Sequence, residues 1–315
     1  MSTFYDELIS DVNEEIEHLH GTKKRYKAYI NYHDLVKDFG NTYIYDIWLS
    51  DELHLEEEED IQLSSVGHHM TATVVTVHEN QNITIRLNGK LTKEIYTLTK
   101  TFDPTFILTS LKVSLNQVKS DPNELSCAIQ SACTFCETFE LNECIELPSS
   151  LNHSQKLALA KAENYKISFI WGPPGTGKTF TLAQIIFRAY LRGDRALIVS
   201  TSNVAVDQVL LAFDRLSSNL DKSSVWRLGT SDEQRCIEYT REGLDTNKAK
   251  LVFSTLATLV IKYPIISTIP FDMVIIDEAS MVSLPYIFIT ANLSKRNTVI
   301  VGDFNQLPPI SQTSS

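Results

Sequence analysis

The stretch that decides the fold of the second half of the chain is Ile167–Trp171 followed by Gly172-Pro173-Pro174-Gly175-Thr176-Gly177-Lys178-Thr179. Its G-x-x-x-x-G-K-T pattern lies between an apolar run typical of a strand and a segment, Thr179 to Leu191, typical of a helix. Glycines are needed in such a loop because backbone N–H groups must converge on a phosphate without a Cβ in the way. The N-terminus of the following helix adds positive potential at the same point. This stretch therefore predicts a phosphate-binding loop, or P-loop.

Two side chains of this loop have predicted roles toward a bound nucleotide. Lys178 is expected to reach the β- and γ-phosphates of ATP, and the Thr179 hydroxyl is expected to ligate Mg²⁺. The other loop residues, Gly172 to Gly177, are expected to surround the phosphates. ATP and Mg²⁺ are accordingly the predicted cofactors.

Further apolar runs follow the P-loop at intervals, separated by helical or polar stretches. They are Arg195–Ser200, Leu251–Thr255, Met273–Asp277 and Thr298–Gly302. Continuous apolar strands that alternate with helices are typical of a parallel sheet covered on both faces. Residues 151–315 are therefore predicted to form an α/β domain of the P-loop type.

Two adjacent carboxylates end one of these runs. Asp277 and Glu278 follow four apolar residues, which places them at the C-terminal end of a predicted strand, where ligands bind in open α/β sheets. Asp277 is expected to hold Mg²⁺, directly or through water. Glu278 is expected to polarise the attacking water as a general base.

The first half of the chain has a different pattern. Apolar residues from Phe4 to Leu19 recur at spacings of three and four, which predicts an N-terminal helix within residues 1–28. Residues 29–102 read as a small β-barrel or half-barrel, with Thr71–Val77 and Ile83–Leu87 forming a hairpin. Residues 103–150 are expected to be a helical stalk, because Asp103-Pro104 and Asp121-Pro122 each resemble a helix start.

Composition leaves the partner open. The net charge of −11 and the pI near 5.2 count against a nucleic-acid binder, but five of the negative charges fall within Glu56–Asp60 alone. The N-terminus is not a signal peptide, and the longest apolar run, around Leu251–Val260, is too short for a bilayer. An intracellular protein without a membrane segment is expected.

The cysteines pose a separate question, because four of them cluster: Cys127, Cys133, Cys136 and Cys144. The Cys133-x-x-Cys136 pair suggests zinc or an iron–sulfur cluster. The same spacing also fits cysteines on the buried face of a helix, without a metal.

Five other segments, taken in order with the P-loop and Asp277-Glu278, resemble the motifs of superfamily 1 helicases, most closely the nonsense-mediated-decay helicase and senataxin group. The similarity covers 151–309, and the barrel and stalk are similar in order to that group. The segments are Leu151–Gln155, Ser200–Gln208, Trp226–Gly229, Val252–Leu256 and Val301–Pro309.

The resemblance implies a RecA-like lobe and further roles. Gln155 would read the adenine edge, and Gln306 would sense the γ-phosphate and couple hydrolysis to movement. Ser202, Asn203 and Thr255 would contact the backbone of single-stranded RNA or DNA, although helix caps and turns are the ordinary roles of such residues.

The chain ends at Ser315, directly after the last of these motifs. The second RecA-like lobe is absent from it, and with it the family's arginines that stabilise the transferring phosphoryl group, each worth about 10³–10⁵ in rate. We therefore expect nucleotide binding, slow hydrolysis and no unwinding by these residues alone. Two alternatives are an ATP-gated binding module without turnover and an AAA+ assembly ATPase; the latter lacks room for its helical lid.

Overall fold

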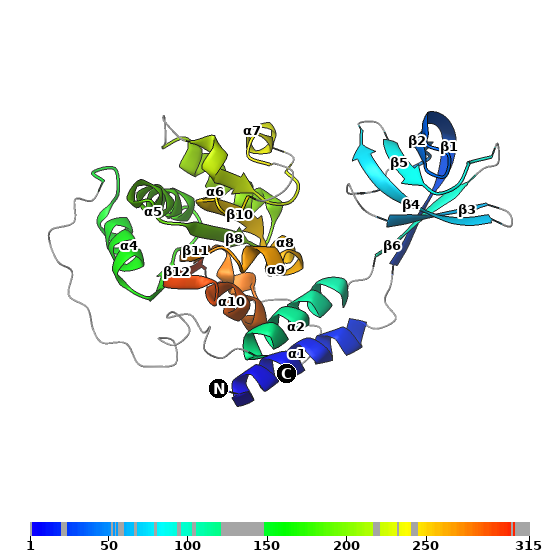
Figure 1. Cartoon of the computed structure of the whole chain (residues 1–315). Coiled ribbons are helices and arrows are strands. Elements are labelled where there is room, and N and C mark those ends of the chain that lie inside the picture. The colour runs from blue at the N-terminus through cyan, green and yellow to red at the C-terminus, as the bar shows by residue number, and fades with distance from the viewer. Residues whose placement is uncertain are drawn as a thin grey trace. The chain divides into compact units, whose positions relative to one another are not determined.

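A computed structural model describes most of the chain, which divides into two compact units (Figure 1). One unit is Leu19–Thr105, and the other joins Met1–His18 to Phe106–Ser315. The described residues are 2–19, 24–51, 53, 55, 60–65, 68–78, 81–92, 96–102, 105–120, 148–216, 221–231, 233–240, 245–303 and 305.

The unit Leu19–Thr105 is a closed antiparallel barrel with the strand order β1-β2-β5-β4-β3-β6. Residues that alternate along the strands fill its interior, and Ile47, Leu63, Val74 and Ile85 have no exposed surface. Closure leaves no open sheet edge. The predicted barrel is confirmed, as is the predicted hairpin, formed by β4 and β5. The strands are β1 (Lys24–Asp38), β2 (Tyr43–Leu49), β3 (Asp60–Ser65), β4 (His68–Val77), β5 (Asn82–Leu87) and β6 (Thr97–Phe102).

Two helices of the other unit lie side by side, α1 (Ser2–Leu19) and α2 (Thr105–Ser120) (Figure 1). The Lys119 side chain of α2 forms an ion pair with Asp6 of α1. The helix expected within residues 1–28 ends at Leu19, because Lys24–Tyr29 pair with β6 and thereby close the barrel.

Helix α2 lies where the first helix of the predicted stalk is expected, and four residues on one of its faces are buried, namely Leu108, Leu111, Leu115 and Val118. Residues 121–147 lie outside the described residues. The second predicted helix and the cluster of four cysteines fall there, so the stalk and the metal both remain predictions.

The core of this unit is a parallel six-stranded sheet with the order β7-β12-β11-β8-β10-β9. Its five longer strands match the predicted apolar runs. The sixth, β9, is an edge strand of three residues, too short for periodicity to detect. The strands are β7 (Ile167–Trp171), β8 (Ala196–Ser200), β9 (Val225–Arg227), β10 (Leu251–Thr255), β11 (Phe271–Ile276) and β12 (Ser294–Gly302).

Helices cover both faces of the sheet (Figure 1). On one face lie α4 (His153–Asn164), α5 (Lys178–Arg192) and α6 (Asn203–Asp214), and on the other lie α8 (Leu256–Ile261), α9 (Tyr263–Ile266) and α10 (Leu284–Ala291). The rings of Phe4 and Tyr5 on α1 contact Phe288 of α10. Shorter helical segments are η2 (Lys222–Ser224), α7 (Gln234–Ile237) and η3 (Ala279–Met281). Among the described residues, no helix has both the length and the apolar character that a membrane span requires.

The direction of the side chains decides what gathers at the C-terminal rim of the sheet. Ile198, Phe253 and Ile275 pack in one core cluster with α5 and α6. Because alternate residues of a strand face the same side, Ser200, Thr255 and Asp277 also point toward the α5 and α6 layer. The rim therefore brings residues of several predicted motifs to the face where α5 begins.

Candidate nucleotide-binding site

The P-loop joins β7 to α5, and its backbone has the conformation that the glycines predict. Gly175 and Gly177 have φ values of +79° and +81°, in the left-handed region that glycine adopts without strain. Gly177 caps α5 without a side-chain hydrogen bond. The first N–H groups of α5 therefore lack a capping side chain, which suits them to bind an anion.

The Lys178 side chain lies across this loop. Its Nζ donates to the carbonyl oxygen of Gly172 at 2.7 Å. A Cβ on Gly172 would lie 2.7 Å from Cγ of Lys178, so this position has no room for a side chain. The ammonium group is thus held over the loop, where phosphate oxygens are expected.

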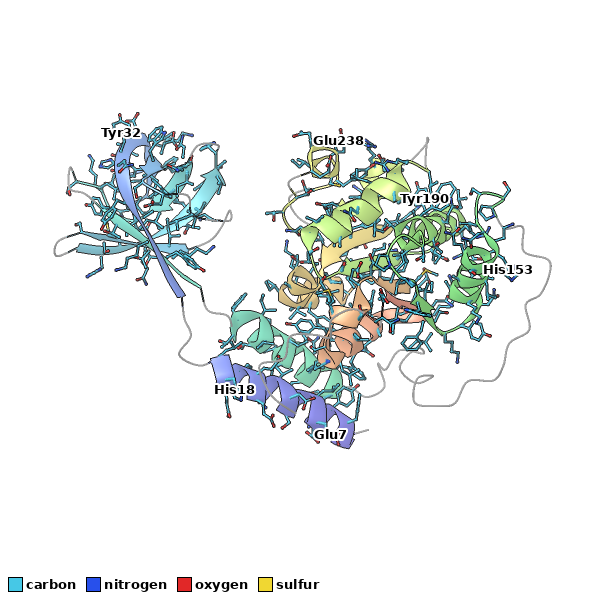
Figure 2. The ribbon with its side chains drawn as sticks, turned by 180° about the vertical axis from the view of Figure 1, so that it is seen from behind. Glu7, His18, Tyr32, His153, Tyr190 and Glu238 are labelled. Carbon is cyan, nitrogen blue, oxygen red and sulfur yellow. The ribbon has the colours of Figure 1, made fainter. Side chains whose placement is uncertain are left out.

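Gln155 lies close to the P-loop from the first turn of α4, which begins at His153 (labelled in Figure 2). Its Oε1 accepts from the Asn152 N–H at 3.0 Å, and its Nε2 donates to the Thr176 carbonyl oxygen at 3.1 Å. The backbone N–H of Gln155 donates in turn to Asn152, which completes a capping box. These contacts support the loop, and the predicted reading of adenine by Gln155 remains a prediction.

Asp277 follows β11 and is 5% exposed. Its backbone N–H donates to the Val199 carbonyl oxygen at 2.8 Å, which aligns it with Ser200 at the end of β8. Within the described part of the chain, neither Oδ1 of Asp277 nor Oγ of Ser200 has a hydrogen-bond partner, although both are buried. A buried polar atom without a partner is costly unless a ligand or water satisfies it.

The pKa of Asp277 is raised to about 6, chiefly by burial and in smaller part by the negative charge of Glu278. The positive charge of Lys178 and a hydrogen bond from the Glu278 backbone act in the opposite direction. Lys178 and Asp277 are therefore close enough to interact, although they come from different strand ends. The buried, unpaired carboxylate oxygen fits a hard cation such as Mg²⁺, which prefers oxygen ligands. Thr179, adjacent to Lys178 in the first turn of α5, is half-buried.

Glu278 has an unusual backbone conformation. Its φ of +53° is left-handed, which is rare for a residue with a long side chain and recurs at functional sites. The turn that follows, η3, lies against the end of β12, where a Cβ on Gly302 would be 2.9 Å from the Ser280 backbone nitrogen. Gly302 thus permits the close approach of the two motifs.

The residue after β12, Asp303, is buried at the same rim. Its Oδ1 accepts from Trp171 Nε1 at 3.1 Å and from the Asn305 N–H at 3.1 Å. The ends of the neighbouring strands β7 and β12 are thereby linked. Gln306 lies outside the described residues.

Comparison with known proteins gives the family of this chain. A family model described as an AAA domain matches residues 150–246 and 238–314, which together exceed half of the chain. The chain belongs to the superfamily 1 helicases.

Similar curated helicases are much longer than this chain. "DNA replication ATP-dependent helicase/nuclease JHS1" of Arabidopsis thaliana is 34% identical over 177 residues, 52% of this chain and 13% of that protein. "DNA replication ATP-dependent helicase/nuclease DNA2" of Homo sapiens is 31% identical over 176 residues, which are 51% of this chain and 16% of that protein. "ATP-dependent helicase NAM7" of Saccharomyces cerevisiae is 31% identical over 202 residues, and the match covers 51% of this chain and 20% of that protein. Among solved structures, the UvsW helicase of bacteriophage T4 is 18% identical and covers 55% of this chain and 58% of that one, with a TM-score of 0.38.

The helicase residues predicted to contact nucleic acid lie at the same rim, away from the P-loop. Ser202 and Thr255 each cap a helix, since their hydroxyl oxygens accept from the N–H groups of Ala205 and Thr258, both at 3.2 Å. Asn203 Oδ1 accepts from Arg227 Nη2 at 2.9 Å. The structure therefore gives all three a structural contact, and their predicted nucleic-acid role is untested.

The sequence analysis missed one feature of the helicase lobe, a buried ion pair between Arg227 of β9 and Asp207 of α6. Arg227 Nε lies 2.7 Å from Asp207 Oδ1, and the Arg227 side chain has no exposed surface. Both residues stand within quoted motifs, and the signal was an arginine in the apolar run Val225–Leu228. Among the described residues, no group of three or more His, Cys, Asp or Glu side chains is placed to hold a metal, and Cys236 is a buried free thiol.

Proposed function

We propose that the chain is an ATP-hydrolysing helicase lobe that binds Mg·ATP at the P-loop and single-stranded RNA or DNA across the neighbouring strand ends. The observation that carries the proposal is the meeting of Lys178 and Asp277 at one rim, with an unpaired oxygen of Asp277 buried there. A phosphate-binding loop and a carboxylate that suits Mg²⁺ are the two halves of a nucleotide site.

In the proposed mechanism, the N–H groups at the start of α5 and the Lys178 ammonium bind and orient the β- and γ-phosphates. Thr179 and Asp277 would hold Mg²⁺, whose chemistry is to neutralise charge on the phosphates as the terminal bond breaks. Glu278, half-buried beside Asp277, orients a water molecule and accepts its proton. Gln306 would sense the γ-phosphate and couple hydrolysis to movement.

The nucleic-acid part of the proposal rests on the motif order and on the names of the relatives, two of which are DNA replication helicases. Ser202, Asn203 and Thr255 offer neutral polar groups at the rim, which suit the sugar–phosphate backbone. The same names support an intracellular location. Movement along a strand is proposed for a protein in which this lobe works with a second RecA-like lobe.

Steady-state ATP hydrolysis, with and without single-stranded oligonucleotides of RNA and DNA, tests the proposal. We expect stimulation on the order of tenfold by one of them. Glu278→Gln should retain ATP binding and lower turnover at least about 100-fold. Glu238→Gln, the same change at an exposed position that pairs with Lys222, is the control.

Two outcomes contradict parts of this proposal. Tight ATP binding with negligible, unstimulated turnover favours a binding module without motor activity. Hydrolysis unaffected by Glu278→Gln would remove Glu278 as the base.

A further inference from the structure

Arg227 stands out because it is a fully buried cation in a strand whose other residues are apolar. Its guanidinium group makes a contact with each of its nitrogens. Nε donates to Asp207 Oδ1 at 2.7 Å and Nη1 donates to the Leu228 carbonyl oxygen. Nη2 donates to Asn203 Oδ1 at 2.9 Å and to the Thr230 carbonyl oxygen at 3.1 Å. A buried charge persists only with this degree of pairing.

The partner carboxylate is also fully engaged. Asp207 lies on the buried face of α6 and is 6% exposed. Its second oxygen, Oδ2, accepts from Ser231 Oγ at 2.7 Å. The ion pair is therefore closed to solvent and does not itself offer a charge to a ligand. Its effect must reach the surface through the groups that it holds.

Those groups belong to two neighbouring segments of the rim, and a third segment packs against one of them. Arg227 bonds the start of α6 through Asn203 and the loop after β9 through Thr230. In that loop Gly229 has φ +86° and approaches Thr258, since an added Cβ would lie 3.0 Å from the Thr258 hydroxyl oxygen. That hydroxyl accepts in turn from Thr255 Oγ1 at 2.9 Å. One guanidinium thus sets the spacing of segments that carry the predicted nucleic-acid contacts.

The contact with Asn203 also fixes what this amide can offer. A side-chain amide has an acceptor oxygen and a donor NH₂ group, and Arg227 occupies the oxygen. Within the described part of the chain, the NH₂ group has one contact, a long one of 3.5 Å with Thr230 Oγ1. Asn203 is half-buried at the first residue of α6, so a donor is left at the rim. Donors suit phosphate oxygens, which only accept.

We propose that Arg227 is a positioning residue that orients the Asn203 amide so that its NH₂ group donates to a phosphate of single-stranded nucleic acid. The inference rests on the proposed function, because it concerns the same nucleic-acid surface. In this arrangement the uncharged Asn203 amide contacts the phosphate, and the buried Arg227 guanidinium holds that amide in the orientation it needs.

A double-mutant cycle tests the inference, with the full chain, a fluorescently labelled single-stranded oligothymidylate or oligouridylate, and binding followed by anisotropy. Arg227→Lys keeps the charge beside Asp207 but loses the planar fork that also reaches Asn203. Arg227→Lys and Asn203→Ala should each weaken binding about tenfold, and the double variant should bind no more weakly than Asn203→Ala alone, because the residues act as one unit. Additive losses, or unchanged binding by Arg227→Lys, would overturn the proposal.

Asn203→Asp keeps the test decisive if Arg227→Lys fails to fold. Its carboxylate still accepts from Arg227, so the thermal midpoint should be retained, but the donor is replaced by a negative charge. Binding should then be weaker than with Asn203→Ala, by about tenfold or more. The matched control is Asn247→Asp, the same change at an exposed residue that precedes β10, at the N-terminal end of that strand, which should bind within about twofold of the unaltered chain.

Two outcomes distinguish a failure of the proposed nucleic-acid function from a failure of the inference about Arg227. If the unaltered chain binds Mg·ATP but neither oligonucleotide, the proposed nucleic-acid function fails and the inference fails with it. If the unaltered chain binds and Asn203→Asp binds equally well, only the inference is overturned.

Discussion

At the scale of single residues, Lys178 donates a hydrogen bond to the same loop that is proposed to bind the phosphates with it. Its ammonium takes the Gly172 carbonyl oxygen as partner, and a phosphate would offer it a stronger, charged acceptor. Lys178→Ala should therefore weaken Mg·ATP binding about 100-fold or more, measured by titration calorimetry. Lys166→Ala, at an exposed position just before β7, is the control, and unchanged affinity in Lys178→Ala would reject the phosphate assignment.

Asp277 gives a prediction about pH. Its pKa is raised from 3.8 to about 6 in the folded chain, so folding favours the protonated form. The resulting stability is present below about pH 4 and is lost as the pH rises through about 6. In EDTA, Asp277→Asn should thus be more stable than the unaltered chain at pH 7.5, by up to about 3 kcal/mol, and should lose that advantage near pH 4. Urea unfolding at both pH values measures this; a less stable variant at pH 7.5 contradicts the burial argument.

Residue types in a motif predicted this site only in part. Gly172 to Thr179 follow local rules, since glycine conformation and helix polarity are encoded within a few residues. The caps formed by Ser202 and Thr255 were foreseeable as the ordinary role of such residues. The Asp207–Arg227 pair was not, because a contact between residues 20 apart depends on how α6 packs against β9.

At the scale of elements, the end of β12 and the turn after β11 approach so closely at Gly302 that no room is left for a methyl group. Gly302→Ala should force the Ser280 backbone away, which costs about 1–3 kcal/mol and displaces the adjacent Asp277-Glu278 turn. Both stability and Mg·ATP affinity should fall. Gly193→Ala is the comparison, because its added Cβ meets open space at the end of α5. This variant should lose about 1–2 kcal/mol of stability, since position 193 has a φ of +81°. Its nucleotide affinity should be unchanged. Equal nucleotide affinities in the two variants would contradict the coupling.

Element prediction succeeded where the pattern is long and failed at boundaries. Continuous apolar runs predicted β7, β8, β10, β11 and β12, since central parallel strands are buried on both faces. The barrel was expected from residue 29, whereas β1 begins at Lys24, because the pairing of Lys24–Tyr29 with β6 is a long-range contact. The alternation in β4 and β5 predicted a hairpin but not the order in which six strands close.

At the scale of the whole molecule, the two units have separate cores. Ile47 belongs to the barrel core and Ile275 to the core of the sheet, and both are fully buried. Ile47→Ala and Ile275→Ala should each cost about 2–5 kcal/mol, but each should lower a different transition in scanning calorimetry. If both substitutions shift one common transition equally, the units unfold as one.

We propose that one Mg·ATP is surrounded, at the rim of the sheet, by the side chains of Lys178, Thr179, Asp277 and Glu278. A crystal structure of the chain with Mg²⁺ and a non-hydrolysable ATP analogue tests it most directly. We predict the β-phosphate within the loop Gly172–Lys178, and Mg²⁺ held by Thr179 and, directly or through water, by Asp277. Nucleotide bound elsewhere, or a metal ion remote from the Asp277 carboxylate, would contradict the account.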